Sequence, residues 1–289
     1  MSSMRRFLTG SPLFLCLCRG KVGVKEIMRF LNASFYQFSA LEDPATWAKE
    51  LRRALRAFDV KGTLILAPEG INGFLAGEPA AVRESLAYIQ RQAPFAKIDI
   101  KESESIDIPF KKFVVKVRPE IVTFRVPGHT PLQAAAPRLS AAELKSWYEE
   151  GREFLVLDTR NEYEVRLGKF KGAQSLNLSQ FVELPAALAP ELEKFRGKPV
   201  VTYCTGGIRC EKAAPYLRHL GLDAYQLDGG ILRYFEDAGG DHWEGECFVF
   251  DERVAVDAAL KATGAALCPK CQGPVPAATP ECIHCGEKV

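Results

Sequence analysis

The segment that most constrains the fold runs from residue 198 to residue 219. An apolar run at 198–203 predicts a short buried strand, and residues 210–219 predict a helix. Only residues 204–209 connect the two. A strand that leads through so short a loop into a helix is typical of α/β domains with a parallel sheet, in which reactive groups gather at the carboxyl ends of the strands.

The residues of this loop predict a reactive thiol. Cys204 follows the strand, and after it come Thr205, Gly206, Gly207, Ile208 and Arg209. The unpaired N–H groups of the loop and the helix start form a cradle for the Cys204 thiolate, and Arg209 adds a fixed positive charge. We therefore expect a thiol pKa well below the free value of about 8.5. A plain buried cysteine before a glycine turn is the alternative. Cys210, which begins the helix, is expected to lie outside the cradle.

The composition is that of an ordinary globular protein. The 289 residues are 47% hydrophobic and 26% charged, enough for two domains plus an appendage. The net charge is only +2, so any affinity for RNA would need a local basic patch. No apolar run reaches the ~18 residues of a membrane-spanning helix.

The nine cysteines are clustered, which does not fit a disulfide framework and favours a reducing cytosol. Cys268, Cys271, Cys282 and Cys285 form two Cys-x-x-Cys pairs with ten residues between them. Such pairs can supply four thiolates in a tetrahedron, so the segment 248–289 predicts a structural zinc site. An iron–sulfur cluster and a tail with free thiols are the alternatives.

The first half of the chain predicts an α+β domain over residues 28–126. The pattern favours strands at 33–39, 63–67, 72–76 and about 97–101, and helices at 44–58 and 79–92. This βαββαβ order is that of a ferredoxin-like split fold. Residues 127–139, rich in proline and small side chains, then form a linker.

The run 110–118 contains a candidate RNA contact. In a strand, Lys112, Lys116 and Arg118 share one face, and the run contains no acidic residue. Three cations on one face can contact phosphates. An ordinary solvated sheet face is the alternative.

The second half predicts an α/β domain over residues 140–247. Strands near 154–158, 200–204 and 224–227 alternate with helices, which implies a parallel sheet. Asp158 and Cys204 both end such strands, so they can be neighbours. Asp158 and Arg160 then either organise the reactive loop or form a structural ion pair.

Two stretches resemble the active site of rhodanese domains. Residues 204–209 match the rhodanese loop, in which four residues separate a cysteine from an arginine; the loop of cysteine phosphatases has five. The Asp-x-Arg at 158–160 matches an upstream rhodanese stretch. Rhodaneses commonly carry a histidine where this chain has Lys169, so no histidine-dependent role is expected there. The resemblance implies that Cys204 passes through a persulfide state.

Four motifs together resemble the oxygen-dependent tRNA uridine hydroxylase family. They lie at 62–73, 204–213, 228–232 and 245–254. The resemblance implies an acylphosphatase-like N-terminal domain and a cytoplasmic oxidoreductase that uses dioxygen to convert the wobble uridine (position 34) of tRNA to 5-hydroxyuridine. tRNA is then the partner, with no DNA or membrane expected. The electron donor stays open, because neither a dinucleotide fingerprint nor an evident iron-binding triad is present.

Two other functions are compatible with parts of the sequence. A rhodanese-type sulfurtransferase, which moves sulfane sulfur to a small or protein thiol acceptor, fits the 204–209 loop equally well. A zinc-knuckle RNA-binding scaffold is the third hypothesis, against which the intact Cys204 and Arg209 argue. The N-terminal domain, the basic run and the cysteine pairs favour the tRNA enzyme.

Residues 1–27 resemble a weak signal peptide without a cleavage site. Since the family resemblance begins near Met28, we expect a misplaced start or a disordered extension here rather than secretion.

Overall fold

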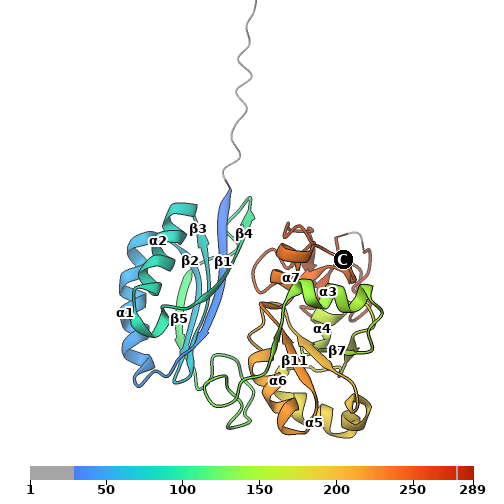
Figure 1. Ribbon diagram of the computed structural model, residues 1–289. Coiled ribbons are helices and arrows are strands. Elements are labelled where there is room, and N and C mark those ends of the chain that lie inside the picture. Colours follow the sequence, from blue (N-terminus) through green and yellow to red (C-terminus); the bar gives the residue numbers. More distant parts are fainter. Residues whose placement is uncertain (1–28, 278) are drawn as a thin grey trace, which may run out of the picture.

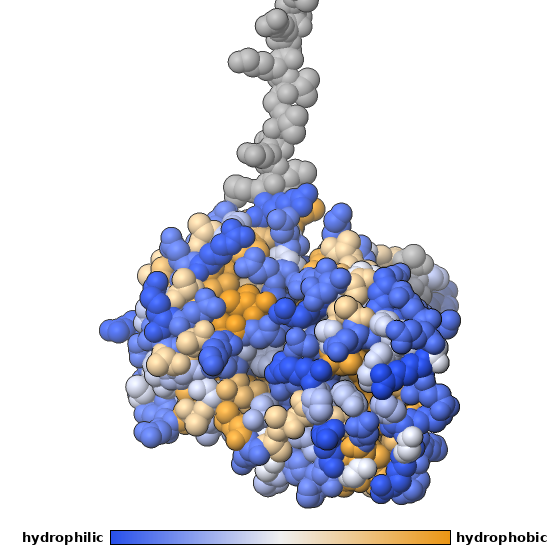
Figure 2. Space-filling model, viewed as in Figure 1, coloured by the Kyte–Doolittle hydropathy of each residue, from blue (hydrophilic) through white to orange (hydrophobic). Residues whose placement is uncertain are grey.

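The computed structural model describes residues 29–277 and 279–289. The expectation for residues 1–27 concerns a segment outside this range. Two α/β units lie side by side, and an irregular segment between residues 117 and 138 joins them (Figure 1). Hydrophilic side chains cover most of the face seen in Figure 2, with apolar side chains in small groups between them. Among the described residues, no helix is both long and apolar enough to cross a membrane.

The first unit is a five-stranded sheet with two helices on one face. Its elements are β1 (Phe30–Phe38), α1 (Pro44–Leu55), β2 (Lys61–Ala67), β3 (Gly70–Gly77), α2 (Pro79–Gln90), β4 (Asp99–Ser105) and β5 (Phe113–Val117), with 3₁₀ turns at Arg56–Phe58 and Ala93–Phe95. The sheet order is β4-β1-β3-β2-β5. The ferredoxin-like prediction is confirmed, and the basic run adds a fifth strand that pairs in parallel with β2.

Alternation along the strands gives this sheet two different faces. Leu31, Ala33 and Phe35 of β1 are buried in the core beneath α1 and α2. The intervening side chains of β1 point the other way, toward the second unit. Figure 1 shows both helices on the outer side of the sheet, so its open face is turned toward the second unit.

The second unit is built on a parallel sheet, as predicted. Its order is β6-β11-β10-β7-β9, and every pairing is parallel. The strands are β6 (Arg138–Leu139), β7 (Leu155–Asp158), β9 (Gln174–Ser175), β10 (Val200–Tyr203) and β11 (Ala224–Leu227). The helices are α3 (Ala141–Glu149), α4 (Glu162–Val165), α5 (Leu184–Leu188), α6 (Cys210–His219) and α7 (Gly230–Ala238), with 3₁₀ turns at Phe181–Glu183 and Ala189–Phe195. All four residues of the central strand β10 are buried.

Short two-stranded sheets complete the structure. They pair β8 (Gly168–Phe170) with β12 (Trp243–Gly245), β13 (Cys247–Phe248) with β14 (Ala255–Val256), and β15 (Ala266–Leu267) with β16 (Pro274–Val275). Val249 and Val256 pack in the core of the second unit. The chain beyond Cys247 therefore contributes to that core before the tail begins.

Buried polar contacts from α6 hold the two units together. The Lys212 ammonium lies 2.8 Å from a Glu69 oxygen and 2.9 Å from a Glu120 oxygen, with only 2% of its side chain exposed. The neighbouring Glu211 accepts a 3.0 Å hydrogen bond from the Tyr36 hydroxyl. Because an unpaired buried charge is costly, these contacts fix the open sheet face against the second unit.

Candidate active site

Cys204 lies at the carboxyl end of the central strand β10, where the parallel sheet opens. The residue is fully buried, and the backbone N–H of Gly207 donates a hydrogen bond to its Sγ at 3.1 Å. Gly207 has φ +93°, a conformation that side chains other than glycine's rarely adopt. A Cβ on Gly230 would lie 2.4 Å from the Cys204 carbonyl oxygen, so glycine is needed where α7 approaches the loop. The loop is thus closed around the sulfur.

The environment of Cys204 favours the thiolate. Burial alone would raise its pKa, but a hydrogen bond from the Cys210 thiol, together with the charge and hydrogen bonds of Arg209, outweighs burial and lowers the pKa to about 5. The Cys204 side chain is therefore charged at neutral pH, as the loop sequence predicts.

Cys210 was expected outside the cradle, and that expectation is wrong. Its thiol is fully buried, lies 3.7 Å from the Thr159 hydroxyl oxygen, and is near enough to Cys204 to lower the pKa of that thiol. Side chains of a helix point back toward its N-terminus, so a cysteine in the first turn is directed toward the end of β10. Burial and the adjacent Cys204 raise the pKa of Cys210, which keeps it protonated as a donor.

Arg209 is held by Glu164, a residue to which the sequence assigned no role. Its Nη1 and Nη2 donate to the two Glu164 carboxylate oxygens at 2.5 and 2.8 Å, and both side chains are buried. Burial alone would raise the Glu164 pKa, but the charge and hydrogen bonds of Arg209 lower it. Thr205 also donates to Glu164, at 3.2 Å. Glu164 thereby fixes Arg209 and Thr205 on one side of the loop.

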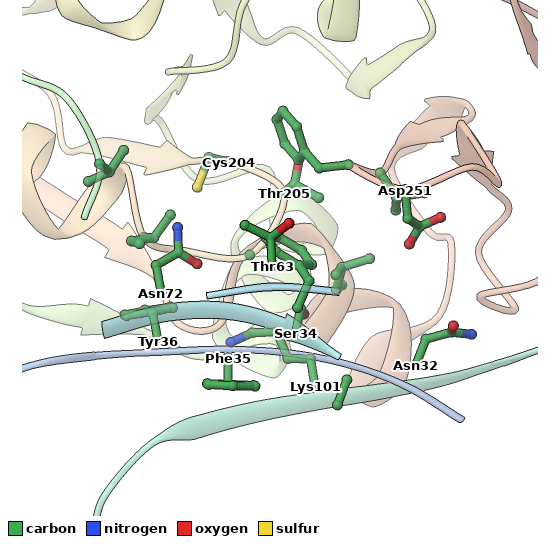
Figure 3. A pocket seen from close by; sticks show the side chains of 18 of the residues that line it. Asn32, Ser34, Phe35, Tyr36, Thr63, Asn72, Lys101, Cys204, Thr205 and Asp251 are labelled. Carbon is green, nitrogen blue, oxygen red and sulfur yellow. The ribbon is translucent and has the colours of Figure 1, made fainter. Parts of the chain in front are cut away.

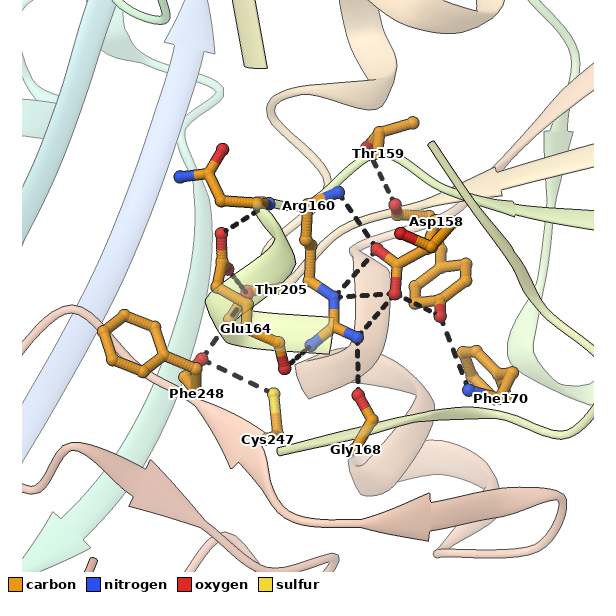
Figure 4. Close-up of polar contacts among 12 residues, drawn as sticks. Asp158, Thr159, Arg160, Glu164, Gly168, Phe170, Thr205, Cys247 and Phe248 are labelled. Carbon is orange, nitrogen blue, oxygen red and sulfur yellow. Dashed lines mark hydrogen bonds and ion pairs between the residues drawn. The ribbon is translucent and has the colours of Figure 1, made fainter. Parts of the chain in front are cut away.

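Asp158 and Arg160 form a completely buried ion pair beside the loop (Figure 4). Arg160 Nη2 lies 2.6 Å from Asp158 Oδ2 and also donates to the Gly168 carbonyl at 2.6 Å. The Tyr203 hydroxyl donates to the same carboxylate. No hydrogen bond from this pair to residues 204–209 occurs in the described part of the chain. The geometry thus favours the structural ion pair over a direct loop contact.

A cavity of about 500 Å³ separates the open face of the first unit from the Cys204 loop. The wall contributed by the first unit includes, among apolar residues, six polar ones: Asn32, Ser34, Tyr36, Thr63, Asn72 and Lys101. Cys204, Thr205 and Asp251 lie opposite them (Figure 3). Sequence reasoning missed this wall, although the alternating polar residues of β1 are its signal.

The three cations of the basic run lie beside this cavity rather than in it. Lys112, Lys116 and Arg118 are exposed. Lys116 is in register with Ile65, which lines the cavity, so it lies on the same sheet face at its edge. Their exposure is compatible with the RNA contact and with the solvated face alike.

The four tail cysteines come together as a candidate metal centre. Their Sγ atoms all lie within 4.8 Å of one another, with 3.8 Å between Cys268 and Cys285 and 3.6 Å between Cys271 and Cys282. Four sulfurs at about 2.3 Å from a tetrahedral Zn²⁺ lie about 3.8 Å apart. The cluster therefore fits a single metal ion. His284 instead places Nε2 at 2.9 Å from the Pro274 carbonyl.

Comparisons with known proteins agree with both units. Residues 30–121 match the family model for the UPF0176 acylphosphatase-like domain, and residues 140–237 match the rhodanese-like domain. A tRNA uridine(34) hydroxylase from Ralstonia nicotianae is 42% identical, over 90% of this chain and 98% of that protein. Proteins of the same name from Cupriavidus necator and Xanthomonas euvesicatoria are 43% and 45% identical, over 86% and 80% of this chain and 90% and 96% of theirs. Since the similarity spans both units and nearly the whole length of these relatives, the chain belongs to the tRNA uridine(34) hydroxylase family.

Proposed function

We propose that this protein uses dioxygen to convert the uridine at position 34 of tRNA to 5-hydroxyuridine, with Cys204 as the catalytic residue. The observation that carries the proposal is the buried Cys204 thiolate facing a cavity of about 500 Å³ lined by both units. The relatives named tRNA uridine(34) hydroxylase supply the substrate and the reaction. The proposed tRNA substrate supports a cytoplasmic location for the enzyme.

The residues around Cys204 have different roles in stabilising its negative charge. The nucleophilic sulfur accepts the Gly207 N–H, and the backbone N–H groups of residues 204–209 would stabilise the negative charge of a persulfide. Arg209 supplies positive charge, while Glu164 keeps its guanidinium in place. The electron donor is left open by these contacts.

The tail cysteines would hold a structural Zn²⁺. Four thiolates would leave no open position on a four-coordinate ion, which is typical of structural rather than catalytic zinc. Bound zinc would supply no chemistry to Cys204. Cys268, Cys271, Cys282 and Cys285 would instead fix the tail by cross-linking its two knuckles.

The exposed cations of β5 and its flanks are proposed to hold tRNA phosphates. Charge reversal of Lys112 and Lys116 should weaken tRNA binding and reduce its salt dependence, because fewer counterions are then released. Charge reversal of Lys145, which is on α3 and pairs with Asp241, is the matched control. Unchanged tRNA binding would show that Lys112 and Lys116 belong to an ordinary solvated sheet face.

The function is tested by complementing a strain that lacks 5-hydroxyuridine. Wild-type protein should restore the nucleoside in aerated cultures but not without air, and Cys204→Ser should not restore it. Nucleosides from purified tRNA are measured by mass spectrometry. Unchanged 5-hydroxyuridine with altered thiouridine would contradict the hydroxylase and support a sulfurtransferase.

A further inference from the structure

The turn between β2 and β3 contacts the second unit, and the strand that follows this turn contributes a side chain to the cavity. Glu69 binds Lys212 of α6 and accepts a 2.8 Å hydrogen bond from the Ile121 N–H. Asn72, three residues later, points from β3 into the cavity that Cys204 faces (Figure 3). Asn72 Nδ2 donates to the Ile121 carbonyl at 3.2 Å. The contact that joins the units therefore also fixes the position and orientation of this amide.

An aromatic ring lies beside Asn72 on the same wall. Phe74 belongs to the central strand β3, where it is in register with Ser34 on one side and Thr63 on the other. All three side chains line the cavity. Phe74 is only half-buried, while its neighbours Gly73 and Leu75 are buried on the helix side. An aromatic side chain thus presents accessible surface inside a cavity with polar groups at its sides.

We propose that this wall is a nucleobase pocket, in which Phe74 stacks on a flipped-out uracil and Asn72 reads its Watson–Crick edge. The inference rests on the proposed function for the identity of the RNA. A base taken out of its stack is usually held by an aromatic face and by hydrogen bonds to that edge. The ring would then lie between the sheet of the first unit and the Cys204 sulfur.

The fixed amide explains how uracil is distinguished from cytosine. Uracil presents the N3–H donor between two carbonyl acceptors, whereas cytosine presents an N3 acceptor beside an amino donor. Asn72 Oδ1, which has no partner among the described residues, can accept from N3–H, while the second Nδ2 hydrogen donates to a carbonyl. A cytosine in the same position requires the amide to be flipped, and the Ile121 carbonyl would then face Oδ1. That arrangement places two acceptors against each other.

The position of the cations fits an RNA that enters from the β5 edge. Tyr36, Asn72, Ile65 and Lys116 form one row across the sheet. The row begins at the Cys204 loop, which Tyr36 contacts, and ends at the exposed Lys116. A nucleotide whose base occupies the pocket can therefore leave its phosphates near Lys116.

The test uses the purified full chain and an anticodon stem-loop RNA with uridine at position 34. We measure how strongly the RNA slows alkylation of Cys204 by iodoacetamide. The uridine RNA should protect Cys204, whereas the same RNA with an abasic site or cytosine at that position should bind but protect little. Phe74→Leu and Asn72→Leu should each raise the RNA concentration for half-protection by roughly tenfold or more. Phe113→Leu, the same change on the helix side of the sheet, is the control.

Alkylation without RNA shows whether each variant keeps its active site, since Cys204 must react at the wild-type rate. Equal protection by uridine and abasic RNA, or wild-type protection in both pocket variants, would overturn the pocket. If Phe74→Leu and Asn72→Leu, each expressed alone, restored 5-hydroxyuridine as well as the wild type does, the pocket would be overturned and the proposed hydroxylase activity would stand. Conversely, protection that depends on Phe74 in a protein unable to restore 5-hydroxyuridine would support the pocket and refute the proposed reaction.

Discussion

The ionisation of Cys204 provides the sharpest test of the site. Its pKa is lowered to about 5, against burial, by the Cys210 thiol and by Arg209. At pH 7 a thiol with a pKa of about 5 is about 99% thiolate, whereas one with a pKa of about 9 is about 1% thiolate. Alkylation of Cys204 should therefore have reached its plateau at pH 7 and decline only near pH 5.

The test removes the charge of Arg209 without leaving the buried carboxylate of Glu164 unpaired. Arg209→Met alone leaves Glu164 as an unpaired buried carboxylate, and breaking a buried pair in this way costs about 3–5 kcal/mol. The double variant Arg209→Met with Glu164→Gln removes both charges. Because Arg209 lowers the pKa through its charge and its hydrogen bonds, we expect the alkylation midpoint to rise by ~1 pH unit or more, a tenfold change in the ionisation constant.

The assay is peptide mass spectrometry after timed alkylation at a series of pH values. Cys247 is the internal control, because burial raises its pKa to about 12 and it should stay unreactive at pH 7. A wild-type midpoint near pH 9, or equal rates for Cys204 and Cys247 at pH 7, would refute the activated thiolate. An unchanged midpoint in the double variant would refute the part assigned to Arg209.

The same pKa predicts how stability depends on pH. The folded pKa of Cys204 is lowered, so the unfolded chain binds the additional proton between pH 5 and pH 9. The contribution of Cys204 is therefore complete above the unfolded pKa and is lost as the pH falls toward 5. The free energy of unfolding of the wild type, relative to Cys204→Ser, should rise by about 1.4 kcal/mol per pH unit in this window. A flat difference in denaturant titrations would contradict the shift.

Three further changes test the surroundings of the site. Cys210→Ala should raise the pH at which Cys204 becomes alkylated, since it removes a hydrogen-bond donor to the thiolate; an unchanged midpoint would argue against that bond. Lys212→Met should lower the free energy of unfolding by about 3–5 kcal/mol, because Glu69 loses its buried partner, and denaturant titration measures this loss. Metal analysis should find about one zinc per chain, and Cys271→Ser should lose it while Cys204 alkylation stays unchanged; bound iron with visible absorbance would exclude zinc.

The sequence was sufficient where neighbouring residues determine the structure. The apolar run before Cys204 and the glycines after it predict a buried strand, a tight loop and a helix, and these are the elements β10 and α6. Alternating apolar and polar positions likewise predict strands of the first sheet, and short apolar runs between helices predict the second. The two cysteine pairs of the tail meet because their knuckles are short and local. In each case the pattern spans only a few residues.

Contacts between distant segments could not be read from the sequence. Glu164 and Arg209 are 45 positions apart, and neither local pattern indicates that they pair. The Tyr36 contact with Glu211 spans 175 positions and depends on how the two units dock. The prediction for Cys210 was wrong about the direction of a side chain. Cys210 lies in the first turn of α6, which orients its thiol back toward the end of β10. The cavity wall was not predicted either, because the cavity exists only where the two units dock against each other.

The pairing of Arg209 with Glu164 bears on which part of an RNA approaches the loop. An arginine that grips a phosphate uses both arms of its guanidinium for the anion. Here both arms are bound to Glu164, and a phosphodiester that took them over would leave that buried carboxylate without compensation. The neighbouring Cys204 thiolate would also repel the negatively charged phosphodiester. The RNA backbone is therefore expected at the exposed cations near β5, while an uncharged base meets the sulfur through the cavity between the units.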